Sequence, residues 1–74
     1  MDIEWMDGFE ISVTCSDRRE VTIAANREGL LSLAGQLRAL ADGAPGDHIH
    51  YDAYNCLEEG SAEMVIVKEQ TGNR

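Results

Sequence analysis

The stretch that decides the fold is residues 26–41, which read NREGLLSLAGQLRALA. Asn26 stands where a helix N-cap belongs, because its side-chain oxygen can accept hydrogen bonds from the free amides of the first turn. Apolar residues then recur at three- and four-residue spacing: Leu30, Leu33, Ala34, Leu37, Leu40 and Ala41. This spacing predicts a helix with an apolar stripe that packs against a sheet.

Polar residues on the same stretch are expected to face outward, namely Ser32, Gln36 and Arg38. The helical pattern stops at Asp42-Gly43, and Pro45 and Gly46 follow. Glycine suits a left-handed helix cap and proline cannot continue a helix. The helix is therefore predicted to end at residue 41.

Two alternating segments precede the helix. In residues 9–15 and again in residues 20–25, every second residue is apolar: Phe9, Ile11, Val13 and Cys15, then Val21, Ile23 and Ala25. Such alternation is typical of half-buried strands. The four residues between them contain a turn signal, so the pair is predicted to form a β-hairpin. Cys15 is expected to be a small core residue.

Two further strands are predicted after the helix. In residues 48–51, Ile49 and Tyr51 share one face and the two histidines share the other. Residues 62–68 contain Met64, Val65, Ile66 and Val67 in succession. An unbroken apolar run of this kind is typical of a strand that is covered on both faces.

The element order is therefore ββαββ, which predicts an α+β fold: a two-layer sandwich with one helix packed on a four-stranded antiparallel or mixed sheet. We expect the last strand to lie beside the first, which leaves the second and third strands at the edges. One helix covers one face, so the other face is polar or meets another molecule, and exposed edges can pair with a partner. At 74 residues the chain is one domain, 1–74, with an ordered core roughly at 9–69.

Charge and composition narrow the classes of function. Fourteen acidic residues against six basic ones give a net charge of -8. This balance disfavours binding to free nucleic acid, because phosphates are engaged by Lys and Arg. A basic protein is the complementary partner, although surplus acid also serves to keep a small domain soluble. No stretch is long and apolar enough to span a membrane, and the N-terminus lacks the features of a secretory signal, so a cytoplasmic location is expected.

We do not expect an enzyme. Glu58 and Glu59 are adjacent in a turn and would face water, which does not separate the pKa of an acid from that of a base. The sequence contains no Gly-rich phosphate loop and no nucleophile elbow. The two cysteines, Cys15 and Cys56, are expected to stay reduced.

A possible metal site needs separate consideration. His48, His50 and Asp52 alternate along a strand, which sends both imidazoles and the carboxylate the same way. Two histidines at this spacing can chelate zinc if a third ligand is close. The competing interpretation, which we favour, is an exposed polar face that contacts a partner. We expect no metal and no cofactor.

The segment between Arg38 and Lys68 contains no Lys or Arg. It does contain six acidic residues, Asp42, Asp47, Asp52, Glu58, Glu59 and Glu63. Tyrosines also occur here, and tyrosine is enriched at protein interfaces. The predicted partner-binding residues are His48, His50, Asp52, Tyr54, Asn55, Glu58 and Glu59. The alternative is a solvated acidic loop.

The same residues carry a family resemblance. Residues 25–34, then residues 46–52 followed by Tyr54-Asn55, then residues 60–63 before an apolar strand, resemble immunity protein 32 of bacterial polymorphic toxin systems. The resemblance covers about two thirds of the chain. The run His-x-His-x-Asp-x-Tyr-Asn followed by Gly-Ser-Ala-Glu is its more specific part.

The resemblance implies a cytoplasmic protein that binds a toxin domain, for instance a basic nuclease, and neutralises it. It carries over no contact residues. A different class of function remains open on the residues alone: a small metal-binding or regulatory domain that forms a homodimer through its uncovered sheet face.

Overall fold

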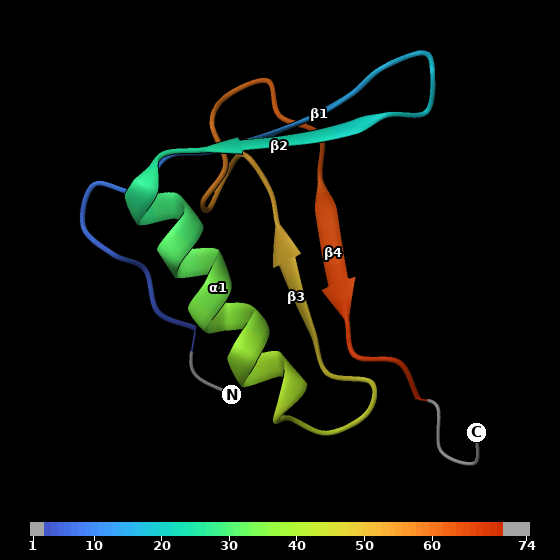
Figure 1. Ribbon diagram of the computed structural model, residues 1–74. Coiled ribbons are helices and arrows are strands. Elements are labelled where there is room, and N and C mark those ends of the chain that lie inside the picture. Colours follow the sequence, from blue (N-terminus) through green and yellow to red (C-terminus); the bar gives the residue numbers. More distant parts are fainter. Residues whose placement is uncertain (1–2, 71–74) are drawn as a thin grey trace.

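The computed structural model describes residues 3–70 (Figure 1). The elements follow one another as β1 (Ile11–Cys15), β2 (Val21–Ala25), α1 (Arg27–Ala41), β3 (His48–Tyr51) and β4 (Met64–Val67). The predicted ββαββ order and the α+β class are confirmed. No helix in this part of the chain is long and apolar enough to cross a membrane.

The predicted single four-stranded sheet is wrong. The strands form two separate antiparallel pairs, β1 with β2 and β3 with β4. The β1–β2 hairpin runs across the upper ends of β3 and β4 in Figure 1. The residues just before β4, and not β4 itself, lie beside β1: the amides of Glu58 and Ala62 donate to the carbonyls of Ile11 and Val13 at 2.8 and 2.7 Å. The chain then turns away from β1 to join β3.

The start of α1 agrees with the sequence. The Asn26 side-chain oxygen accepts from the amides of Gly29 at 2.8 Å and Glu10 at 2.9 Å, so the predicted N-cap is confirmed. Its Nδ2 donates to the carbonyl of Gly8 at 2.8 Å. One side chain therefore caps the helix and ties it to the segment that enters β1.

The predicted orientation of α1 is wrong in part, although Leu33 and Leu40 are buried as predicted. The buried residues of the helix are Gly29, Ser32, Leu33, Gln36 and Leu40. Leu30 and Leu37 are instead 54% and 44% exposed, and Ala34 and Ala41 are exposed with them. The helix is rotated about its axis relative to the prediction, so that two polar residues face inward and one edge of the apolar stripe faces water.

Buried Ser32 and Gln36 are tolerated because each of their buried polar atoms has a hydrogen-bond partner. The Ser32 hydroxyl accepts from the amide of Met6 at 2.9 Å and donates to the carbonyl of Glu28 at 2.8 Å. Gln36 accepts from the Tyr51 hydroxyl at 2.7 Å and donates to the carbonyl of Glu4 at 2.9 Å. Arg38 is exposed, as predicted.

The core lies where α1, β1 and β3 meet the loop before β4. Its buried apolar residues are Ile11, Val13, Leu33, Leu40, Ile49, Tyr51 and Leu57. Trp5 stacks on Phe9 with ring centroids 4.5 Å apart and meets Tyr51 edge-on at 6.2 Å. The segment before β1 therefore closes one side of the core.

Two predictions of burial fail at the ends of strands. Cys15 is exposed, since the far end of the hairpin extends beyond the core. The run in β4 is not covered on both faces, because Val65 and Val67 are 52% and 54% exposed. Among residues 3–70, α1 is the one helix and no second layer covers the other side of β3 and β4, so every second residue of β4 faces outward.

The Tyr51–Gln36 hydrogen bond yields a first prediction. Burial raises the pKa of the Tyr51 phenol to about 12, with a smaller contribution from the Cys56 charge. Because the folded state favours the protonated phenol, this stabilisation is complete below the unfolded pKa of about 10 and is lost as the pH rises toward 12.

The Tyr51→Phe substitution should cost about 1–3 kcal/mol at neutral pH, because it leaves the buried Gln36 oxygen without its donor. It should also flatten the loss of stability above pH 10. Urea unfolding followed by Trp5 fluorescence at neutral and alkaline pH measures both effects. Equal stability of the two proteins at neutral pH would contradict the prediction.

The two glycines inside α1 give a matched pair of substitutions. A Cβ at Gly29 would lie 2.5 Å from the Glu10 carbonyl oxygen and 2.9 Å from Ile11 Cγ1, whereas a Cβ at Gly35 would meet nothing within 4 Å. Gly35→Ala should stabilise the protein by about 1 kcal/mol through helix propensity. Gly29→Ala should destabilise it by about 1–3 kcal/mol, because the helix must move off β1. Thermal melts of both variants decide, and a gain at both positions would refute this packing.

Candidate functional site

The face of β3 and β4 that points away from α1 is the first part of the site. Antiparallel pairing sets His48 opposite Val67 and His50 opposite Val65, and all four side chains are exposed. We call these four residues the outer face. The two imidazoles meet edge to face with ring centroids 4.9 Å apart. The inward pairs, Ile49 with Ile66 and Tyr51 with Met64, face the core.

Beside the outer face lies an open hollow of about 600 Å³, lined by Asp52, Ala53, Tyr54, Glu59, Gly60, Ser61 and Glu63. We call it the acidic hollow, because three carboxylates and no Lys or Arg line it. Gly60 has a φ of 86° there, a left-handed conformation that lets the chain reverse before β4. Tyr54 is 98% exposed, so its ring projects from the rim into water.

Asp52 shapes the loop that carries Tyr54. Its Oδ1 accepts from the amides of Tyr54 and Asn55 at 3.0 and 2.9 Å, and its Oδ2 accepts from Asn55 Nδ2 at 3.2 Å. Side-chain bonds of this kind fix a turn locally. Asp52 and Asn55 therefore hold the backbone that presents the tyrosine, and only part of the Asp52 carboxylate is left for a partner.

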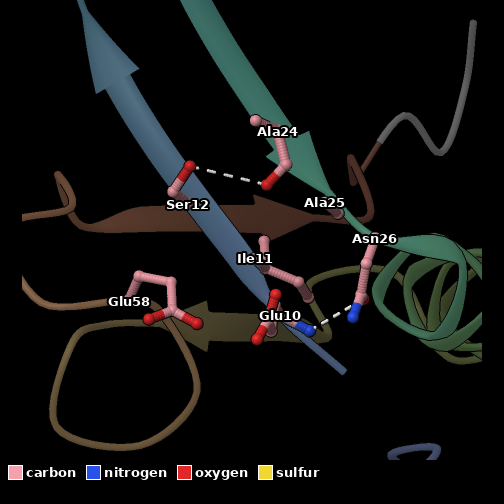
Figure 2. A pocket seen from close by; sticks show the side chains of 7 residues that line it. All are labelled: Glu10, Ile11, Ser12, Ala24, Ala25, Asn26 and Glu58. Atoms are coloured by element: carbon pink, nitrogen blue, oxygen red, sulfur yellow. Dashed lines mark hydrogen bonds between the residues drawn. The ribbon is translucent and has the colours of Figure 1, made fainter. Parts of the chain in front are cut away.

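Glu58 lies apart from the other predicted residues. Its amide bonds to β1, and its side chain lies at a second hollow of about 370 Å³ on the hairpin (Figure 2). Glu10, Ser12, Ala24 and Asn26 share this hollow, together with Ile11 and Ala25. Figure 2 shows the carboxylates of Glu10 and Glu58 on the same side of the hairpin. The adjacent pair Glu58 and Glu59 is thus divided between two hollows.

The structure adds residues that the sequence interpretation missed. Glu63 belongs to the acidic hollow, and Val65 and Val67 belong to the outer face. The alternation of Glu63, Val65 and Val67 along one side of the strand was the available signal. It was obscured because the intervening residues are also apolar.

The described residues include possible metal ligands and the two cysteines. Within residues 3–70, no three His, Cys, Asp or Glu side chains gather closely enough to hold a metal ion. Cys15 and Cys56 are not joined in a disulfide. Burial raises the pKa of the Cys56 thiol, which keeps it protonated and a poor nucleophile.

The site is thus a solvent-open surface of carboxylates, imidazoles and apolar side chains on a small α+β domain, an arrangement suited to binding a macromolecule. The family model for Immunity protein 32 matches residues 20–69 of the chain. The chain belongs to this family, and an immunity protein has a toxin as its partner. Neither the curated proteins nor the solved structures include a match to the chain.

The loop geometry predicts a difference between two substitutions of one residue. Asp52→Ala removes the acceptors of three hydrogen bonds and should destabilise the protein by about 1–2 kcal/mol. Asp52→Asn retains the Oδ1 acceptor and should cost less, while removing one charge from the acidic hollow. Urea unfolding of both variants tests this, and equal losses would show that the charge, rather than the turn, stabilises the loop.

Proposed function

We propose that this protein neutralises a bacterial toxin domain by binding it through the acidic hollow and the outer face. The observation that carries the proposal is the open hollow with three carboxylates and an exposed tyrosine, in a chain of the Immunity protein 32 family. No catalytic group is needed for this function, since a tightly bound inhibitor acts by occupying space.

Charge supports the choice of surface. The segment between Arg38 and Lys68 contains six acidic residues and no Lys or Arg, and the chain carries a net charge of -8. A basic partner is steered toward such a surface and associates faster at low salt. A nuclease domain is one partner of this kind: carboxylates that enter its cationic groove occupy the places that substrate phosphates would take.

Tyr54 supplies the apolar contribution that charge alone lacks. Rim carboxylates mainly affect the association rate, whereas a few buried aromatic side chains commonly dominate binding energy. A tyrosine that is almost fully exposed, on a loop already fixed by Asp52, loses little entropy on binding. We infer that the toxin buries this ring, and that the cytoplasm of the producing cell is where the complex forms.

The proposal predicts that charge reversal in the acidic hollow weakens binding. The double substitution Glu59→Lys with Glu63→Lys should raise the Kd for the toxin domain encoded beside the gene by about 10- to 100-fold. The matched control is Asp17→Lys with Glu20→Lys, which makes the same change in net charge on the exposed turn between β1 and β2. The control should change the Kd by no more than about threefold.

Isothermal titration calorimetry at two salt concentrations measures the affinities, and co-expression with the active toxin measures protection of growth. Rescue of growth by the native protein and loss of rescue by the Glu59 and Glu63 variant are expected. Unrelieved killing in the presence of the native protein would refute the proposed function. Equal weakening by both double variants would refute the assigned surface.

A further inference from the structure

The edge of β4 that faces away from β3 is open. Within residues 3–70, β4 pairs with β3 alone. The Lys68 amide donates to Asp47 and the Lys68 carbonyl accepts from Gly46, both at 2.8 Å, so the backbone of Lys68 points toward β3. The backbone N–H and C=O groups of successive residues in a strand point alternately toward one neighbouring strand and the other. Because those of Lys68 point toward β3, those of Val67 and Val65 point away from it.

Both faces of β4 are also incompletely covered. Val65 and Val67 are about half exposed on the outer face, and Met64 and Ile66 are only partly buried on the inner face. The run of four apolar residues has the composition of a central strand but the position of an edge strand. An added strand would bury side chains on both faces and pair the free backbone groups.

Two other strand edges are unpaired in the described chain. Residues 58–62 occupy the free side of β1, so the outward side of β2 is one of them, and the side of β3 away from β4 is the other. The residues of β3 whose backbone groups point away from β4 are His48 and His50, so the apolar edges to compare are those of β2 and β4, and these two differ in charge. β2 is preceded by Asp17, Arg18, Arg19 and Glu20, whose formal charges cancel, whereas β4 is preceded by Glu63 and followed closely by Glu69.

The charges at the ends of β4 are negative. Glu63 and Glu69 flank the strand and are exposed. The Lys68 ammonium is turned back onto α1, where it donates to the carbonyls of Ala41 and Gly43 at 2.7 Å each. An incoming strand with Lys or Arg at its ends would therefore meet two carboxylates that form no ion pair with any residue from 3 to 70.

The same charges disfavour a second copy of this chain. Antiparallel self-pairing centred on Ile66 sets Glu63 of each copy opposite Glu69 of the other, and like charges directly opposite in a ladder are destabilising. Each copy also has a net charge of -8. The charges at the β4 edge therefore disfavour pairing with a second copy of the chain and favour pairing with a basic partner.

We propose that the free edge of β4 receives an extended segment of the toxin, an apolar strand flanked by Lys or Arg, which extends the β3–β4 pair into a three-stranded sheet. This inference rests on the proposed function. Val65 pairs with His50 across the outer face, and Glu63 lines the acidic hollow, so the edge is continuous with the surface already assigned to the partner. Main-chain hydrogen bonds between β4 and the added strand would contribute to the affinity and would fix the direction and register of the toxin segment, which charge attraction alone does not fix.

Hydrogen exchange at single amides tests the inference on the native protein and the toxin domain encoded beside its gene. In the free protein the Val65 and Val67 amides should exchange rapidly, and in the complex they should slow by about 100-fold or more. The outward amides of Val21 and Ile23 in β2 should be unchanged. A complex in which Val65 and Val67 exchange as in the free protein would overturn edge pairing and leave the proposed function standing.

Proline substitutions give a second test. Val65→Pro removes an outward amide, which an edge strand tolerates, and should weaken binding by about 10- to 100-fold. Val65→Thr retains the amide and the branched shape and should weaken binding less than Val65→Pro does. Ile23→Pro, the equivalent change at the β2 edge, should leave the affinity unchanged.

Native affinity of the Val65→Pro variant would overturn the inference. Weakening by Ile23→Pro in its place would assign the toxin strand to β2 and overturn it as well. If Val65→Pro fails to fold, as judged by circular dichroism, the exchange measurement on the native protein decides. Failure of the native protein to bind the toxin domain would refute the proposed function and this inference together.

Discussion

The hydrogen bonds from residues 58–62 to β1 are the constraint on which the rest of the structure depends. In the described part of the chain no β-ladder joins the two strand pairs, so these bonds and the side chains beneath them hold the β1–β2 pair across the β3–β4 pair. They also position the site. Ser61 lines the acidic hollow while its hydroxyl accepts from the Val13 amide at 3.2 Å. The loop that carries the carboxylates is therefore part of the framework of the fold.

A buried polar chain sets the orientation of the helix on this framework. Gln36 bridges Tyr51 in β3 and the Glu4 carbonyl in the segment before β1, so three distant parts of the chain meet at one side chain. Unpaired, the amide of Gln36 would make its burial unfavourable. With its partners present, it fixes one rotation of α1 and excludes the rotation that would bury Leu30 and Leu37.

This arrangement explains which features could be predicted from the sequence. The N-cap at Asn26, the hairpin and the strand at residues 48–51 depend on residues close in the chain, and local patterns predicted them. The buried face of α1 depends on contacts between residues 15 to 32 positions apart, which hydropathy alone does not reveal. The single sheet failed for the same reason, since a loop took the place beside β1. At the candidate site, Glu58 and Glu59 line different hollows, which their adjacency in the sequence does not reveal, and the exposure of Val65 and Val67 was not predicted.

Strands β3 and β4 differ in their contributions to stability and to the proposed binding surface. The inward side chains Ile49 and Tyr51 of β3 are almost fully buried, so the free protein keeps its core without help from a partner. β4 contributes less to that core and leaves Val65 and Val67 about half exposed, and an exposed apolar edge strand of this kind can pair with other chains unless charge opposes it. The negative charges of Glu63 and Glu69 oppose such pairing between copies. In the proposed complex the same two carboxylates would also attract a basic strand, because repulsion between copies and attraction to a basic partner follow from the same sign of charge.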